Sequence, residues 1–214
     1  ENAEIDRLAV EKGKLRGFIM KDGKVVDSEN VIVASGAWTP DIVPQLREYI
    51  KPTAQPIITF KKGINASEFS DSLHPVFFSD HDVGMYGFPA TADGTVKIAN
   101  HGTGFTYKYG EPLVETEEMR AMFTAWIKQK IPKLLAAEPS YRICLYCDTL
   151  DNNFFIDHVP DIEGAMIACG GSGHAFKFAP VIGDIISDVF EGKPNEYAPL
   201  FKWRKGGEVS TSRK

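Results

Sequence analysis

The sequence has few cysteines, no long apolar run and no excess of positive charge, and each shortage excludes a class of protein. Three cysteines among 214 residues are too few for a disulfide scaffold and favour a reducing compartment. No window approaches the roughly eighteen apolar residues that a membrane-spanning helix requires. A formal net charge of −5 argues against binding to nucleic acid or to an anionic membrane. We therefore expect neither a nucleic-acid nor a membrane partner.

The two ends of the sequence also lack expected features. The chain opens at Glu1 with neither an initiator Met nor a signal peptide, so we expect a fragment or one piece of a larger intracellular protein. Residues 212–214 read Ser-Arg-Lys and only approximate the peroxisomal address Ser-Lys-Leu. The expected location is therefore cytoplasmic or peroxisomal.

The first fifty residues follow the order of an α/β nucleotide-binding domain. Two apolar runs within 15–26 flank Lys-Asp-Gly, which predicts a hairpin. Residues 30–36 predict a continuous apolar strand, as in a sheet covered on both faces, that ends in glycine. Thr39 and Pro40 then supply an N-cap and a first-turn proline for a short helix.

From Lys51 the pattern changes to short strands separated by turn residues. We predict an antiparallel sheet from the runs 55–60, 76–79, 84–88 and 95–100. Thr116 is the expected N-cap of a helix whose single apolar face packs in a core, and Pro132 ends it.

The last third returns to strands followed by a helix. Residues 142–149 are strand-like, 152–156 continue that strand, and 165–169 form another buried strand. An apolar helix over 181–190 follows, with Gly192 just past its end.

Cys144 and Cys147 form a Cys-x-x-Cys pattern with several interpretations. A zinc site needs two more ligands and only Cys169 remains, so no metal is expected. A thioredoxin-type pair belongs at a helix N-terminus, whereas these residues read as strand. On a strand, Cys144 shares a face with Tyr146, which favours a common site. A buried structural cysteine is the alternative.

Lys97 lies between apolar neighbours in the run 95–100. In a strand, Lys97 and His101 fall on one face, opposite Val96 and Ile98. A lysine that faces a closed cavity is catalytic or strongly paired, whereas a lysine on an exposed strand face is neither.

Residues 169–178 run from a strand through three glycines into a helix. The spacing departs from Gly-x-Gly-x-x-Gly because Phe176 stands where the last glycine should be. The glycines allow close approach of a flat ligand, and the helix N-terminus with Lys177 favours an anionic group. A tight turn that packs a helix onto a sheet is the alternative.

Four motifs in this order resemble the flavin-dependent amine oxidases grouped with monomeric sarcosine oxidase, which include pipecolate, saccharopine and fructosyl-amino-acid oxidases (amadoriases). They are Val33-Ala-Ser-Gly-Ala-Trp38, Tyr86-Gly-Phe-Pro89 with Lys97 and His101, Cys144-Leu-Tyr146 with residues 151–157, and Gly170-Gly-Ser-Gly-His-Ala-Phe-Lys-Phe178. The resemblance implies a mixed α/β and α+β fold of the glutathione-reductase-like, DAO type. Residues 1–50 and 144–214 would be part of a Rossmann-like FAD-binding domain, and 51–143 an antiparallel-sheet substrate domain.

The resemblance also implies roles for the matching residues. Cys144 would bond covalently to FAD, and Lys97, with His101 on the same strand face, would assist oxygen reduction. The other cofactor-binding residues would be Ala34, Gly36, Trp38, Gly171, Ser172, Gly173, His174 and Lys177. The substrate would lie against Tyr86, Phe88 and Tyr146, with its carboxylate held by Lys177 and Arg204.

The sequence departs from the family at two points. The strand with Gly-x-Gly-x-x-Gly, which holds the ADP half of FAD, is absent, so we expect this chain to need a further amino-terminal segment. Phe88 stands where fructosyl-amino-acid oxidases tend to carry a glutamate, which favours a secondary-amine substrate over a sugar adduct.

The resemblance therefore predicts the carboxy-terminal portion of an FAD-dependent oxidase of secondary-amine amino acids, of sarcosine, pipecolate or saccharopine type. Hydride transfer to the flavin would leave an imine that water hydrolyses, while O2 is reduced to hydrogen peroxide. One alternative is a fructosyl-amino-acid oxidase. Another is a non-catalytic interaction module without cofactor.

Overall fold

The computed structural model describes residues 3–79 and 84–204, which fall into two compact units. Residues 53–145 form the central unit, and the described residues up to 52 and from 146 onward form the terminal unit. The long strands β5 (Ile50–Lys62) and β10 (Glu138–Thr149) cross from one unit to the other. The sequence Ser-Arg-Lys at 212–214 lies outside the described residues.

The terminal unit opens with a three-stranded antiparallel sheet in the order β1-β2-β3. Its strands are β1 (Ile5–Glu11), β2 (Lys14–Met20) and β3 (Val25–Asp27). The pairing of Ile19 with Val25 confirms the hairpin predicted around Lys-Asp-Gly. Strand β1 was not predicted, because its exposed polar residues alternate with half-buried ones only weakly.

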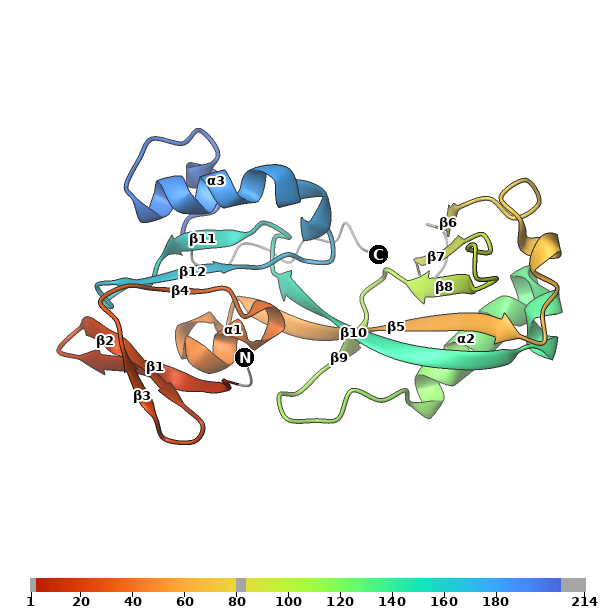
Figure 1. Ribbon diagram of the computed structural model, residues 1–214, viewed down its shortest axis with the longest axis horizontal. Helices are drawn as coiled ribbons and strands as arrows, with labels where there is room; N and C mark the ends of the chain where they lie inside the picture. Colours follow the sequence, from red (N-terminus) through yellow and green to blue (C-terminus); the bar gives the residue numbers. More distant parts are fainter. Residues whose placement is uncertain (1–2, 80–83, 205–214) are drawn as a thin grey trace. The chain divides into compact units, whose positions relative to one another are not determined.

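The second sheet of the terminal unit has the order β11-β12-β4, from β11 (Phe155–His158), β12 (Ala165–Cys169) and β4 (Val31–Val33). Strand β12 pairs antiparallel with β11 and parallel with β4. Helix α3 (Ala179–Phe190) lies across this sheet (Figure 1), where Ile185 packs with Ile156 and Met166. The predicted strand 165–169 and the helix after it are confirmed.

Three local predictions in the terminal unit were wrong. Ile32 of β4 is 39% exposed, so the strand is not covered on both faces in the described part of the chain. Helix α1 (Thr39–Ile42) has Trp38 at its N-cap without a side-chain bond, and Thr39 is buried inside its first turn, although Pro40 stands in that turn as predicted. Short 3-10 helices flank it: η1 (Gly36–Trp38) and η2 (Pro44–Leu46).

The segment 152–156 does not continue β10, which is the third correction. The carboxylate of Asp151 accepts the N–H of Asn153 at 3.1 Å, and Asn152 has a φ of 62°. These features turn the chain, and β11 begins at Phe155 in a different sheet.

The central unit contains the predicted antiparallel sheet. Its strands follow the order β10-β5-β8-β7-β6, and β9 (Phe105–Thr106) also pairs with β5. The three strands not yet located are β6 (Phe77–Ser79), at the edge of the sheet, β7 (Met85–Phe88) and β8 (Val96–Asn100). The pairs β5–β8, β7–β8 and β6–β7 are antiparallel.

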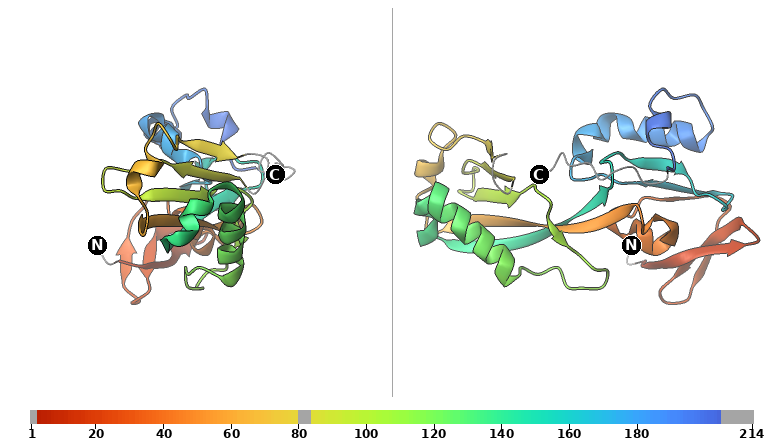
Figure 2. Two further views of the ribbon diagram at one scale, coloured as in Figure 1. Left: turned by 90° about the vertical axis from the view of Figure 1, so that its right-hand side faces the viewer. Right: turned by 180° about the vertical axis from the view of Figure 1, so that it is seen from behind.

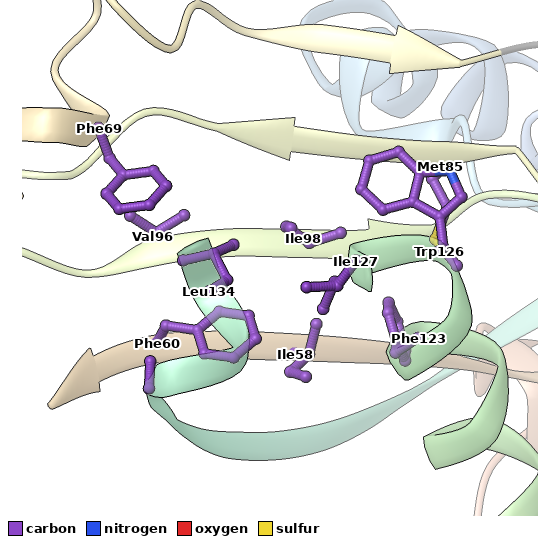
Figure 3. Close-up of a cluster of buried hydrophobic side chains, with 11 residues drawn as sticks. Ile58, Phe60, Phe69, Met85, Val96, Ile98, Phe123, Trp126, Ile127 and Leu134 are labelled. Carbon is purple, nitrogen blue, oxygen red and sulfur yellow. The ribbon is translucent and has the colours of Figure 1, made fainter. Parts of the chain in front are cut away.

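Helix α2 (Glu117–Lys130) covers one face of this sheet, as the view from behind in Figure 2 shows. The hydroxyl of Thr116 accepts the N–H of Met119 at 3.3 Å, which confirms the predicted N-cap. Phe123, Trp126 and Ile127 point from the helix towards the sheet (Figure 3). Each buried side chain of this size stabilises the fold by about 1.5–3 kcal/mol, so the helix fixes the sheet that carries the central-unit candidates.

Shorter helices complete the described structure: η3 (Ala66–Phe69), η4 (Pro132–Ala136), η5 (Ala175–Phe178) and η6 (Ala198–Leu200). Among the helices of the described ranges, none combines the length and the apolar character needed to cross a membrane. The same residues contain no group of three or more His, Cys, Asp or Glu side chains arranged to hold a metal ion.

Candidate functional site

The candidate residues divide between the two units. The terminal unit carries four groups: the residues after β4, Tyr146, the segment after β12, and Arg204. The central unit carries Tyr86, Phe88, Lys97, His101 and Cys144. Within each unit, side chains that lie far apart in the sequence come into contact.

The glycine loop, residues 170–174, is bonded to the end of β10. Ser172 is fully buried and its N–H donates to the carbonyl of Cys147 at 3.0 Å. Its hydroxyl accepts the N–H of Thr149 at 3.1 Å and lies 3.3 Å from the Thr149 hydroxyl. The Ser172 side chain therefore faces β10, where it positions the loop.

Gly173 brings Tyr146 together with this loop. It has a φ of +73°, and a Cβ built there would lie 2.2 Å from Cε2 of the Tyr146 ring. Any side chain at this position would displace the ring. Gly173 is thus required by packing against the predicted pocket tyrosine, whatever ligand approaches the loop.

His174 carries an acceptor without a partner. Its Nε2 lies 2.9 Å from the carbonyl oxygen of Asn152, so Nε2 is the donor and Nδ1 is left as the acceptor. Nδ1 is buried and has no hydrogen-bond partner among the described residues. The ring packs edge-on against Phe154, with centroids 5.6 Å apart.

The turn after β4 leaves open space. Gly36 has a φ of +56°, and no atom lies within 4 Å of where its Cβ would be. Ala34 and Trp38 beside it are exposed, Trp38 by 46%. The open space at Gly36 and the exposed indole of Trp38 suit the approach of a flat cofactor such as FAD. In the same unit, Nδ1 of His174, which has no partner among the described residues, can accept a hydrogen bond from such a cofactor.

Arg204 does not have the free guanidinium that a substrate carboxylate requires. Its Nε and Nη2 donate to the two carboxylate oxygens of Asp151, each at 2.6 Å. The remaining N–H groups donate to the backbone carbonyls of Phe154, Lys202 and Asn153. All five donors of an arginine are thereby used, so this structure assigns Arg204 to holding the turn after β10.

Lys177 keeps its charge available in the described structure. It lies in η5, it is exposed, and its Nζ is 5.6 Å from the ring centroid of Phe178. No acidic side chain among the described residues pairs with it. Among the described residues, the cation of Lys177 is therefore without an acidic partner, unlike that of Arg204.

In the central unit, Lys97 lies against two aromatic rings. Its Nζ is 5.2 Å from the centroid of Tyr86 and 5.2 Å from that of Phe88. The two rings are nearly perpendicular, at 86°. Phe88 pairs directly with Lys97 across β7 and β8, which explains the contact. Within the described ranges Lys97 makes no ion pair, so its charge is balanced only by ring faces.

His101 lies beyond the strand that carries Lys97. β8 ends at Asn100, and the ring of His101 packs edge-on against Phe78 at 6.3 Å. Val96 and Ile98 are fully buried, and so is Ala99 on the opposite side. Because β8 ends one residue before His101, the face that Lys97 and His101 were expected to share stays a prediction.

Cys144 is the most accessible of the three cysteines. It is half-buried and not in a disulfide, whereas Cys147 and Cys169 are buried. Nη2 of Arg142 points to its sulfur at 3.8 Å. Of the two cysteines in the Cys-x-x-Cys pattern, Cys147 is the buried one, and the role of Cys144 stays a prediction.

Several residues that shape the site were missed from the sequence. Thr149 and Asp151 carry most of the bonds that hold the turn after β10, through the contacts with Ser172 and Arg204 described above. The only available signal was that Asp151 follows a predicted strand, which is common. Cys169 was considered solely as a zinc ligand.

Comparison with known proteins identifies the family to which the chain belongs. Residues 1–189 match the family model described as DAO, FAD dependent oxidoreductase. N-methyl-L-tryptophan oxidase from Salmonella dublin is 30% identical over 181 residues, which are 79% of this chain and 45% of that protein. Monomeric sarcosine oxidase from Streptomyces avermitilis is 29% identical over 166 residues, 74% of this chain and 43% of that protein.

Among solved structures, the deglycating enzyme fructosamine oxidase (Amadoriase II) from Aspergillus fumigatus superimposes with a TM-score of 0.78. It shares 26% identity, and the match covers 94% of this chain and 51% of that chain. The chain spans less than half the length of the curated relatives above. The fold predicted from the four motifs is confirmed, and the chain belongs to the DAO family of FAD dependent oxidoreductases.

Proposed function

We propose that this chain supplies the flavin-ring and substrate end of an FAD-dependent oxidase of secondary-amine amino acids. The observation that carries the proposal is the position of Lys97, which makes no ion pair within the described ranges and whose Nζ lies 5.2 Å from the ring centroids of both Tyr86 and Phe88. Two relatives named as oxidases of N-methylated amino acids support it. The ADP half of FAD would need residues that this sequence does not contain.

The reaction divides between cofactor and protein. FAD, when bound, supplies the hydride acceptor. The substrate loses a hydride from a carbon next to nitrogen and a proton from nitrogen, and water hydrolyses the imine. Lys177 would hold the substrate carboxylate through its exposed cation, and the Tyr146 ring, fixed against Gly173, would bound the pocket.

Lys97 would act in the oxygen step. As electrons reach O2, negative charge develops on oxygen, and a nearby cation without a carboxylate partner stabilises it. The aromatic contacts hold the ammonium without neutralising it, since a ring face offers only a quadrupole. An ion pair at this position would remove much of that effect.

Substrate comparison tests the proposed reaction. Hydrogen peroxide release from sarcosine, pipecolate and fructosyl-glycine is measured with the FAD-loaded protein. We expect turnover of at least one secondary-amine amino acid and little of the sugar adduct, because Phe88 presents no carboxylate to sugar hydroxyls. Strong activity on fructosyl-glycine alone would refute this choice.

A fructosyl-amino-acid oxidase is the second candidate, because solved structures of that kind match 94% or more of this chain. The same substrate series decides between the two. The third reading, a non-catalytic module, requires that the full protein bind no flavin and release no peroxide from any of the three substrates.

Covalent attachment of FAD through Cys144 is a further part of the proposal. The support is a half-buried thiol outside any disulfide, on the strand that also carries Tyr146. Acid precipitation of the flavin-loaded protein should give a yellow pellet, and Cys144→Ser should give a colourless one with flavin in the supernatant. Cys147→Ser is the matched control, and a yellow pellet from Cys144→Ser rules out the assignment.

A further inference from the structure

Strand β5 changes its partner partway along its length. It pairs with β9 up to Ala54 and with β8 from Ile57 onward. The two residues between, Gln55 and Pro56, therefore lie opposite the five residues of segment 100–104. A proline has no N–H to donate to a ladder, which accounts for the break in pairing. Such interruptions are frequent next to active sites, where they re-aim a side chain.

The side chain of Gln55 joins the two sides of this interruption. It is 1% exposed, and its Nε2 donates to the carbonyl of Gly102 at 3.3 Å and to the hydroxyl of Thr53 at 3.2 Å. Gly104 has a φ of +66°, and a Cβ built there would lie 2.2 Å from the same Nε2. Only glycine at this position leaves room for the amide. Gln55 thus ties segment 100–104 directly to β5.

His101 lies within the segment that Gln55 holds. Its backbone N–H donates to the carbonyl of Gly84 at 2.8 Å, and a Cβ on Gly84 would lie 2.7 Å from the carbonyl oxygen of His101. The N–H of the next residue, Gly102, donates to Oδ1 of Asn100 at 3.3 Å. The bonds to Gly84 and within the segment fix the backbone of His101, and the Gln55 amide fixes the carbonyl that follows it.

Stability alone does not explain the buried amide of Gln55. Its Oε1 is buried and has no hydrogen-bond partner among the described residues, which destabilises the fold. The acceptors of its Nε2 belong to Thr53 and Gly102, which are half-buried, so water can replace the amide at both. An apolar side chain of similar shape would therefore serve stability at least as well. Polar groups that are kept at a cost in stability are typical of functional sites.

We propose that Gln55 is a positioning residue of the oxidase site: its amide fixes segment 100–104 and thereby the place of the His101 imidazole. The inference rests on the proposed function for the part that His101 takes in the reaction. Gln55 acts through His101 and needs no contact of its own with cofactor or substrate. The ring of His101 packs edge-on against Phe78, so a shift of the segment would move the imidazole relative to that ring.

NMR of the histidine side chains in the full FAD-loaded protein tests the position of His101, whose signal is identified by its loss in His101→Gln. Gln55→Met keeps the bulk of the side chain and removes the amide. We expect it to shift the His101 signal, because the ring moves relative to Phe78, while the urea midpoint stays the same or rises. Thr53→Val is the matched control: it removes the other acceptor of Nε2, keeps the bond to Gly102 and should leave the His101 signal in place.

Turnover of a secondary-amine amino acid tests the consequence for the reaction. Gln55→Met should lower kcat by about 10- to 100-fold with little change in KM, the loss expected when a reacting group is misplaced by a fraction of its own size. Thr53→Val should turn over at the parent rate. A lower urea midpoint with unchanged kcat in Gln55→Met would assign the amide to stability alone and overturn the proposal.

An unchanged His101 signal in Gln55→Met, or an equal shift in Thr53→Val, also overturns it. The parent protein gives a measurement that needs no variant: the side-chain amide protons of Gln55 should exchange slowly with solvent, and fast exchange contradicts the bond to Gly102. If the parent turns over none of the amines, the proposed function fails, whereas the NMR signal still decides whether Gln55 positions His101. The two proposals can therefore fail separately.

Discussion

Each of the two units holds a positively charged side chain, and the two differ in how that charge is balanced. In the terminal unit it is Arg204 at the turn after β10, and in the central unit it is Lys97 among aromatic rings. Arg204 donates all of its N–H groups to protein oxygens, two of them on Asp151. Lys97 makes no ion pair within the described residues and lies against two rings. A neutralised, fully bonded cation fixes backbone shape, whereas an uncompensated one can act on a bound molecule.

The pKa of Asp151 shows that its ion pair with Arg204 is strong. Burial alone would raise the pKa of Asp151, but the hydrogen bonds from Arg204 and from the backbone of Asn153 outweigh it and lower this pKa to about 2. The two side chains are only 27% and 23% exposed. The guanidinium also stacks 3.9 Å above the Phe155 ring. This is a structural ion pair, not a ligand site.

The largest expected effect follows from removing the uncompensated charge. Lys97→Met should slow flavin reoxidation by oxygen by about 100- to 1000-fold, the usual loss when one stabilising group is removed from developing negative charge. Stability should change little, because Met keeps the contact with the rings. Stopped-flow reoxidation measures the effect, with substrate affinity recorded beside it.

Lys61→Met is the matched control for Lys97→Met, since Lys61 is an exposed lysine of the same unit that pairs with Asp93. It should leave reoxidation unchanged. Equal rates in both variants and the parent protein would take Lys97 out of the oxygen step.

Removing the ion pair between Arg204 and Asp151 should lower the free energy of unfolding and not the rate of reoxidation. Arg204→Met removes the partner of a largely buried carboxylate, which we expect to cost about 2–4 kcal/mol of unfolding free energy. Urea unfolding of the protein measures it, with Lys202→Met as the control because Lys202 is an exposed neighbour. A loss below that of the control would show that Asp151 does not depend on Arg204.

The contrast between these cations also shows what the sequence could predict. Lys97 was found because a lysine between Val96 and Ile98 interrupts a buried alternation, which is a local signal. The bonds of Arg204 to Asp151 join residues from separate segments, and no periodicity encodes them. The family resemblance implied that Lys97 assists oxygen reduction and that Arg204 holds the substrate carboxylate. Only the fold shows that Arg204 is fully bonded, whereas Lys97 makes no ion pair within the described residues.

The helices and strands also divide into those predicted from local sequence signals and those that depend on tertiary packing. Strand 165–169 and the helix α3 after it were predicted because apolar periodicity and the following Gly192 are local. The exposed face of Ile32 and the shift of the N-cap from Thr39 to Trp38 depend on which elements pack nearby. The bond from the Gly170 N–H to the sulfur of Cys147 depends on sheet assembly, which a Cys-x-x-Cys pattern does not encode.

Acid should weaken the terminal unit through Asp151. A carboxyl whose pKa falls on folding stabilises the fold above its unfolded value of 3.8, and this contribution is lost as the pH drops towards about 2. The expected loss is on the order of 2 kcal/mol. Urea unfolding at several pH values between about 5 and about 2.5 should show it in the parent protein.

In Arg204→Met this acid-dependent loss should be much smaller, because the interaction that lowers the pKa of Asp151 is already gone. Parallel pH profiles of the parent and the variant would mean that other carboxyls carry the acid sensitivity.

The smallest effect is expected from giving Lys97 a carboxylate partner, as Arg204 has in Asp151. Phe88 faces Lys97 directly across β7 and β8, so Phe88→Glu would place a carboxylate beside the ammonium and neutralise it. We expect reoxidation to fall by about tenfold, less than in Lys97→Met, because the pair is partly exposed and water screens it. Phe88→Gln is the matched control: it loses the ring as the glutamate does but adds no charge. If Glu and Gln slow reoxidation equally, the ring contact matters and the free charge does not; if only Glu slows it, an uncompensated cation is what distinguishes Lys97 from Arg204.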